Sequence, residues 1–325
     1  MEVATFCAES RVVVVAGKGG VGKTTVAATL AKMGANAGLS VLIVELEGKS
    51  GITTIFGIDG PLGYDETVLV DGGPGAPGSV RARQITPDDA LLEYLADHGL
   101  RRVSKRLMKS GVIDVVATAI PGIQDVLVLG KVKQLEQNRV ADLIVVDAPA
   151  TGHAVTFLTS ASGLLDAARG GPVRAQAADV VELLSDPARC RVVLVTLPEE
   201  MPVSETVEAA YQLEDKANIQ LGPVVVNAYE DTPLGLDEGA RAAAEAAGVV
   251  LSFDQLEALD GARLFRLERN ALQAAQIERL GRELPLPQLR TPLLGAAALG
   301  PVELETLAAA LATGVAGLSA EVAPR

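Results

Sequence analysis

The chain has 325 residues, nearly half of them hydrophobic, and its 41 acidic side chains outnumber its 28 lysines and arginines, for a net charge of −13. This acidic balance argues against a general affinity for nucleic acid or anionic membranes, while the apolar content is sufficient for a large core. Cys7 and Cys190 form no C-x-x-C pair, so we expect a reducing compartment and no zinc site. No apolar run approaches the ~18 residues of a membrane span, and residues 1–10 lack a signal-peptide pattern, so we expect a soluble cytoplasmic protein.

The first predicted element is a buried strand, 12–15, which leads through a glycine-rich loop into a helix that starts at Thr25. The loop fits G-x-x-x-x-G-K-[ST] between a strand and a helix, which is the context that a phosphate-binding loop requires. Its backbone N–H groups and the helix N-terminus would bind phosphate oxygens. We expect Lys23 to contact the β- and γ-phosphates and the Thr24 hydroxyl to bind Mg²⁺. The predicted nucleotide contacts in this loop are Gly17, Lys18, Gly19, Gly20, Val21, Gly22, Lys23, Thr24 and Thr25.

Further along the chain, continuous apolar runs alternate with helical patterns, which is typical of parallel strands covered on both faces. The predicted strands are 41–44, 80–85, 143–147, 192–196, 223–227 and a short extended piece at 288–291. The predicted helices are one that starts at Thr86, then 123–138, 154–186 with a break near Gly171, 237–283 and 301–312, followed by a loose tail at 314–325. We therefore predict one α/β domain over 1–325. It is a P-loop NTPase with a mostly parallel, doubly wound sheet flanked by helices, and with a helical insert subdomain at 86–125 and 154–186.

Part of the predicted insert, 100–116, mixes basic and apolar side chains. Three interpretations stay open: ordinary core with a solvated basic face, a lid over an apolar groove that takes a client, or a basic surface for an acidic partner or anionic lipid.

Two polar residues end predicted strands, where ligands of an open parallel sheet bind. Asp147 is expected to complete the Mg²⁺ site with Thr24, the alternative being a cap for the following turn. The amide of Asn227 matches the adenine edge, the alternative being an ordinary turn residue. No N-K-x-D or T-K-x-D sequence occurs, which favours ATP over GTP.

Hydrolysis also needs a group that orients the attacking water, and Glu45 and Glu47 follow the second strand. For both, the alternative is a solvated loop charge, more so for Glu45. Spacing alone favours an exposed loop lysine at Lys18, and a structural hydrogen-bonding role for His153.

The pair Lys18 and Lys23 gives the loop a deviant Walker A form, Lys-Gly-Gly-Val-Gly-Lys-Thr-Thr. Three further stretches, Asp147–His153, Pro121–Asp125 and Val225–Asn227, resemble motifs of the arsenite-pump and guided-entry (ArsA/Get) ATPases. The resemblance implies a dimeric ATPase that uses Mg²⁺ and in which Lys18 reaches the partner subunit's nucleotide. It also implies that Asn227, Pro292 and Leu293 contact adenine.

The chain departs from that family pattern in three places. Where the family's first switch carries D-P-A-H, this chain has Glu47-Gly48-Lys49-Ser50, so the resemblance assigns the water-orienting role to Glu47, one methylene longer. The thiols of arsenite sites and of zinc clasps are absent, and Met108 is the only methionine of the insert. This pattern is similar to an actinobacterial branch with a single ATPase half, whose members occur as paralogue pairs, so a homodimer or a heterodimer is expected.

The sequence thus predicts an ATP-hydrolysing dimeric switch that couples ATP binding and hydrolysis to an unknown protein client, membrane-associated or not. Its predicted catalytic residues are Lys18, Lys23, Glu47 and Asp147. The alternatives are a nucleotide-dependent scaffold that hydrolyses little ATP, a subunit of an arsenite-type anion pump, and a partitioning ATPase on DNA, which the acidic charge disfavours.

Overall fold

The structure is a computed structural model, and it describes residues 1–46, 51–71, 78–97, 122–149, 151–231 and 235–318, with only the backbone of 151–153. Glu47 and the whole segment 100–116, with its Met108, lie outside the described residues, so the predictions that depend on them are untested.

The strands are β1 (Val12–Gly17), β2 (Val41–Glu45), β3 (Thr67–Val70), β4 (Val80–Gln84), β5 (Leu143–Asp147), β6 (Cys190–Thr196), β7 (Val224–Tyr229) and β8 (Gln288–Pro292). They form an eight-stranded sheet in the order β3-β4-β2-β5-β1-β6-β7-β8. All neighbouring pairs are parallel except β3 and β4, which are antiparallel. The mostly parallel α/β fold predicted from the sequence is therefore confirmed.

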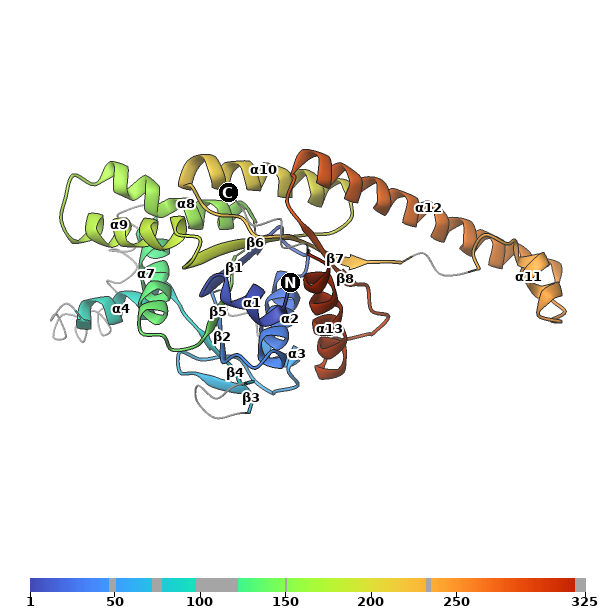
Figure 1. The fold of residues 1–325 in the computed structure, drawn as a ribbon, viewed down its shortest axis with the longest axis horizontal. Helices are drawn as coiled ribbons and strands as arrows, with labels where there is room; N and C mark the ends of the chain where they lie inside the picture. Colours follow the sequence, from blue (N-terminus) through green and yellow to red (C-terminus); the bar gives the residue numbers. More distant parts are fainter. Residues whose placement is uncertain (47–50, 72–77, 98–121, 150, 232–234, 319–325) are drawn as a thin grey trace.

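The helices are α1 (Val3–Ala8), α2 (Lys23–Asn36), α3 (Gly51–Ile55), α4 (Pro87–Asp97), α7 (Ile123–Gln137), α8 (Thr151–Ala167), α9 (Pro172–Ser185), α10 (Glu200–Ala217), α11 (Ala240–Ala246), α12 (Phe253–Glu283) and α13 (Pro301–Gly317). Alternate side chains of β2 point to opposite faces of the sheet. Leu42 and Val44 join a core with α7, α8, α9 and α10. Val41 and Ile43 join a second core with α1, α2, α3 and α13. Helices thus cover both faces of the sheet, as a doubly wound fold requires (Figure 1).

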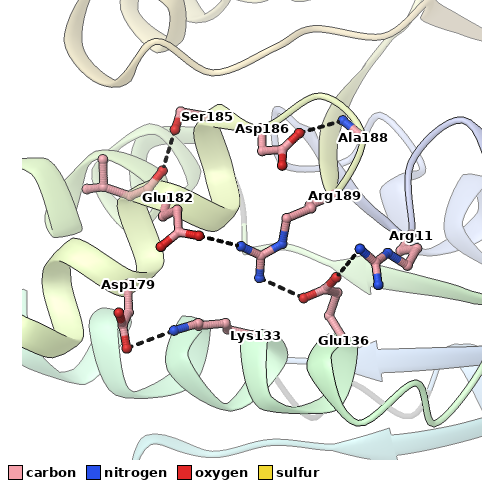
Figure 2. A network of polar contacts seen from close by, with 10 residues as sticks. Arg11, Lys133, Glu136, Asp179, Glu182, Ser185, Asp186, Ala188 and Arg189 are labelled. Atoms are coloured by element: carbon pink, nitrogen blue, oxygen red, sulfur yellow. Dashed lines mark hydrogen bonds and ion pairs between the residues drawn. The ribbon is translucent and has the colours of Figure 1, made fainter.

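A network of charged side chains lies at the amino ends of β1 and β6 (Figure 2). The buried carboxylate of Glu136, near the end of α7, binds Arg189 at 2.7 Å and Arg11 at 3.1 Å. Arg11 precedes β1 and Arg189 precedes β6. This carboxylate therefore holds the amino ends of two strands to one helix, at the end of the strands opposite the glycine-rich loop.

The long helix α12 leaves the body and extends toward α11, which lies at the far end of the molecule in Figure 1. Its first residues are set by a capping box, in which Ser252 and Gln255 each accept the other's backbone N–H. Buried residues of α12 occur only in its second half, from Asn270 to Leu280. We refer to residues 240–265 as the arm. No helix among the described residues is both long enough and apolar enough to cross a membrane.

The structure also corrects several sequence-based boundaries. The helix after the loop begins at Lys23 and not at Thr25. The helix predicted over 301–312 continues to Gly317, because Val315 is buried against the core, so 314–317 is not a loose tail. The edge strand β3 had no sequence signal, since it is four residues long and Val68 is exposed. The break predicted near Gly171 is confirmed, and it separates α8 from α9.

Candidate functional site

The glycine-rich loop connects β1 to α2 and lies where the chain leaves little room for side chains. A Cβ at Gly17 would come within 2.4 Å of the Val195 carbonyl oxygen. At Gly22, which has a left-handed backbone with φ of 89°, a Cβ would come within 2.2 Å of the Asn227 side-chain nitrogen. Both positions therefore require glycine, as a loop that wraps closely around phosphate does.

Thr24 and Asp147 meet at the base of this loop. Asp147 is the last residue of β5, is buried, and lies in register with Val15 of the neighbouring strand β1. The Thr24 hydroxyl, in the first turn of α2, donates a 2.6 Å hydrogen bond to its Oδ2. A hydroxyl and a carboxylate are the oxygen ligands that Mg²⁺ prefers, so these two residues fit such an ion. Their role as magnesium ligands stays a prediction.

The two lysines of the loop both contact atoms of their own chain. The Lys23 Nζ donates to the backbone carbonyl of Lys18 at 3.2 Å. The Lys18 Nζ lies 2.5 Å from Oε1 of Glu205, which is on α10. The loop geometry thus brings Lys18, Lys23, Thr24 and Asp147 together, and it adds Glu205, which no sequence motif indicated.

The Asn227 amide is bonded on both sides within the chain. Its Nδ2 donates to the Val21 carbonyl at 2.8 Å, and its Oδ1 accepts from the Thr291 hydroxyl at 2.8 Å. Asn227 does not end its strand, because β7 continues to Tyr229 after Ala228, which has a positive φ of 54°. Each bond uses one of the two N–H donors or one of the two oxygen lone pairs of the amide, so Asn227 can keep both bonds and still pair with adenine. No sequence pattern indicates Thr291 as its partner.

Pro292 and Leu293 lie beside the end of β7. Pro292 is in register with Tyr229, and the Leu293 N–H donates to the Tyr229 carbonyl at 2.9 Å. The Arg290 guanidinium stacks on the Tyr229 ring, 4.9 Å from its centroid. The predicted adenine contacts therefore share one side of the loop, next to an aromatic ring that sequence reasoning did not single out.

Glu45 differs from the solvated charge considered as an alternative, because it is only 2% exposed. It ends β2 in register with Asp147, so two carboxylates stand on neighbouring strand ends near the loop. Glu47 and the side chain of His153 lie outside the described residues, and their predicted roles are untested.

A parallel sheet with a glycine-rich loop between β1 and α2, and an aspartate at the end of the adjacent strand, defines a P-loop NTPase. Residues 10–167 match the family described as anion-transporting ATPase, and the chain belongs to that family. The resemblance expected from its motifs is therefore confirmed.

Several curated proteins are similar to this chain. ATPase BagA of Mycobacterium tuberculosis is 41% identical over 67% of this chain and 64% of its own length. An arsenical pump-driving ATPase of Halobacterium salinarum is 28% identical over 67% of this chain and 35% of its own length. The ATPase get3 of Schizosaccharomyces japonicus is 29% identical over 44% of this chain and 42% of its own length. The chain therefore spans less than two thirds of the length of these relatives.

Proposed function

We propose that this protein is an ATP-hydrolysing molecular switch that works as a dimer with two nucleotides at the subunit interface. The observation that carries the proposal is the contact between Thr24 and Asp147 at 2.6 Å, directly beneath a loop that tolerates only glycine at Gly17 and Gly22. When bound, Mg²⁺ would neutralise charge on the β- and γ-phosphates. Thr24 and Asp147 would hold the ion, and Lys23 would move from the Lys18 carbonyl to the phosphates.

The test measures ATP binding and turnover in Lys23→Ala and Asp147→Asn variants. Removing one preorganised charge from a phosphoryl-transfer site is expected to lower turnover by about a hundredfold or more. Lys32→Ala is the matched control, because Lys32 is on the same helix but binds Glu305 on α13. Full turnover in Lys23→Ala would contradict the proposal.

The adenine side of the site is proposed to consist of Asn227, Pro292 and Leu293. Their common position beside the loop supports this, as does the ability of the Asn227 amide to donate and accept at once. If Asn227 reads adenine, Asn227→Ala narrows the preference for ATP over GTP. An unchanged ratio of the two affinities would leave Asn227 with only its structural bonds to Val21 and Thr291.

The proposals of a dimer and of a protein client are based on membership of the family. Lys18 is proposed to reach the nucleotide of the partner subunit, which is a second copy or a paralogue, and Glu47 to orient water. The chain is proposed to form one domain, 1–325, whose helical insert at 86–125 and 154–186 rearranges when the dimer closes, and this rearrangement would change the affinity for a protein client. In this proposal the switch acts in the cytoplasm. Turnover that does not depend on protein concentration would argue against a dimeric site.

A scaffold that holds ATP with little hydrolysis is the second candidate, and the glutamate at position 47 favours it. Single-turnover kinetics separate the two, since a scaffold retains intact ATP after many minutes. An arsenite pump subunit is less well supported, because burial raises the pKa of both cysteine thiols to about 12 and so keeps them protonated at neutral pH.

A further inference from the structure

The ammonium group of Lys18 is held on its own subunit. Its Nζ lies 2.5 Å from Oε1 of Glu205, a residue 187 positions away in the chain. At the same time, the Lys18 carbonyl accepts from the Lys23 Nζ at 3.2 Å. Lys18 thus contacts Lys23 through its backbone carbonyl and α10 through its side chain. The position of the Lys18 side chain therefore depends on a carboxylate outside the loop.

Glu205 is placed to bind and to release this lysine. It lies on α10, at the wall of a hollow of about 400 Å³ between α8 and α10, which is also lined by Val155, Thr156, Thr159, Glu208 and Gln212. The side chains of Lys18 and Glu205 are 36% and 31% exposed. Partly exposed ion pairs are weak, so a more highly charged anion competes successfully for the lysine. A bound triphosphate is such an anion.

We propose that Glu205 is a positioning residue that holds Lys18 on its own subunit until the nucleotide of the partner subunit takes the lysine over. This inference rests on the proposed function, because it takes the role of Lys18 across the dimer as given. The ammonium group of Lys18 cannot make a close ion pair with Glu205 on its own subunit and with a phosphate on the partner subunit at the same time. Dimer closure therefore includes the loss of the contact between Lys18 and Glu205, which weakens association by the strength of that pair.

The first experiment is zero-length cross-linking of the full-length protein with a carbodiimide, which joins an amine only to a carboxylate in direct contact. Without nucleotide, mass spectrometry should find a peptide that links Lys18 to Glu205 within one subunit. With Mg²⁺ and a non-hydrolysable ATP analogue at saturation, this linked peptide should be lost, because Lys18 then pairs with the nucleotide of the partner subunit. The same yield with and without the bound analogue would overturn the inference.

The second experiment compares Glu205→Gln with Glu208→Gln, which lies on the same helix and in the same hollow. The subunit concentration at half-maximal turnover should fall about two- to fivefold in Glu205→Gln, because dimer closure no longer breaks an ion pair. Glu205→Asp should restore part of the wild-type value, and Glu208→Gln should match wild type. A change of stability alone would not shift the concentration dependence in this direction.

The Lys18→Ala variant distinguishes failure of the proposed function from failure of the proposed role of Glu205. If it loses turnover and Glu205→Gln behaves as wild type, the proposed function stands and the role of Glu205 fails. If Lys18→Ala keeps full turnover, Lys18 does not act across the dimer, and both fail.

Discussion

Two buried glutamates, Glu136 and Glu230, each face two arginines, but in different surroundings. Glu136 lies inside the body, where its partner Arg189 is 12% exposed. Glu230 follows β7 at the base of α12, and its partners Arg266 and Arg269, at 3.0 and 3.6 Å, are both more than 40% exposed. From these exposures we expect the two pairs to contribute differently to stability, although their chemistry is the same. When the glutamate is removed, the exposure of the arginine decides how much of its charge is compensated by water.

The largest effect is expected at Glu136. Glu136→Gln removes the charge that Arg189 and Arg11 share, and the buried guanidinium of Arg189 has little access to water. The hydrogen bond that Arg189 donates to Glu136 raises the pKa of Arg189. Without Glu136 the guanidinium still stays protonated, so this cation cannot escape by losing its proton. We expect a loss of about 3 kcal/mol in the free energy of unfolding, measured by denaturant titration.

Two further variants sharpen this prediction. Glu278→Gln, in the pair with Arg282, should cost less than about 1 kcal/mol, because Arg282 is 68% exposed. The double variant Glu136→Leu with Arg189→Met should recover much of the loss, since both charges are removed together. Equal losses in Glu136→Gln and Glu278→Gln would contradict the comparison.

A smaller and local effect is expected at Glu230. Its backbone N–H also donates to Gln273 on α12 at 3.1 Å, so this residue fastens β7 to the base of the helix. Glu230→Gln should cost about 1–2 kcal/mol, because Arg266 and Arg269 turn to water. Hydrogen exchange should accelerate in α12 while β1 and β5 keep their protection. Uniform acceleration across the sheet would show that Glu230 supports the body and not the arm. Glu278→Gln, which removes an exposed pair with Arg282, is the control and should leave exchange unchanged.

The smallest effect is expected on stability at acid pH and concerns Glu93, a partly exposed glutamate that pairs with Lys131. Burial tends to raise the pKa of its carboxyl, but hydrogen bonds from Lys131 and Tyr64 outweigh it and leave the pKa below the usual 4.5. A depressed carboxyl pKa contributes stability that is present above about pH 4.5 and is lost as pH falls through the folded-state value. Glu93→Gln should therefore flatten the decline in melting temperature below pH 4.5. An unchanged acid profile would contradict this assignment.

Sequence reasoning succeeded where the signal is local. Apolar runs gave the central strands, and the loop motif gave the positions of Gly17 to Thr24 between β1 and α2. It failed where a distant residue decides the outcome. Glu45 is buried because β5 lies beside β2, and α13 extends to Gly317 because Val315 packs into the core. The contacts of Asn227 with Thr291, and of Lys18 with Glu205, join segments far apart in the chain and have no pattern of their own.

The shape of α12 gives the molecule mechanical leverage. From Asn270, where burial ends, to Phe253 the helix runs about 25 Å, so a tilt of 10° at its base would displace the tip by about 4 Å. That base is fastened through Glu230 to the strand that carries Asn227. A probe attached near residue 253 would therefore report small rearrangements beside the proposed nucleotide site as a displacement large enough for distance measurements between spin labels or fluorophores.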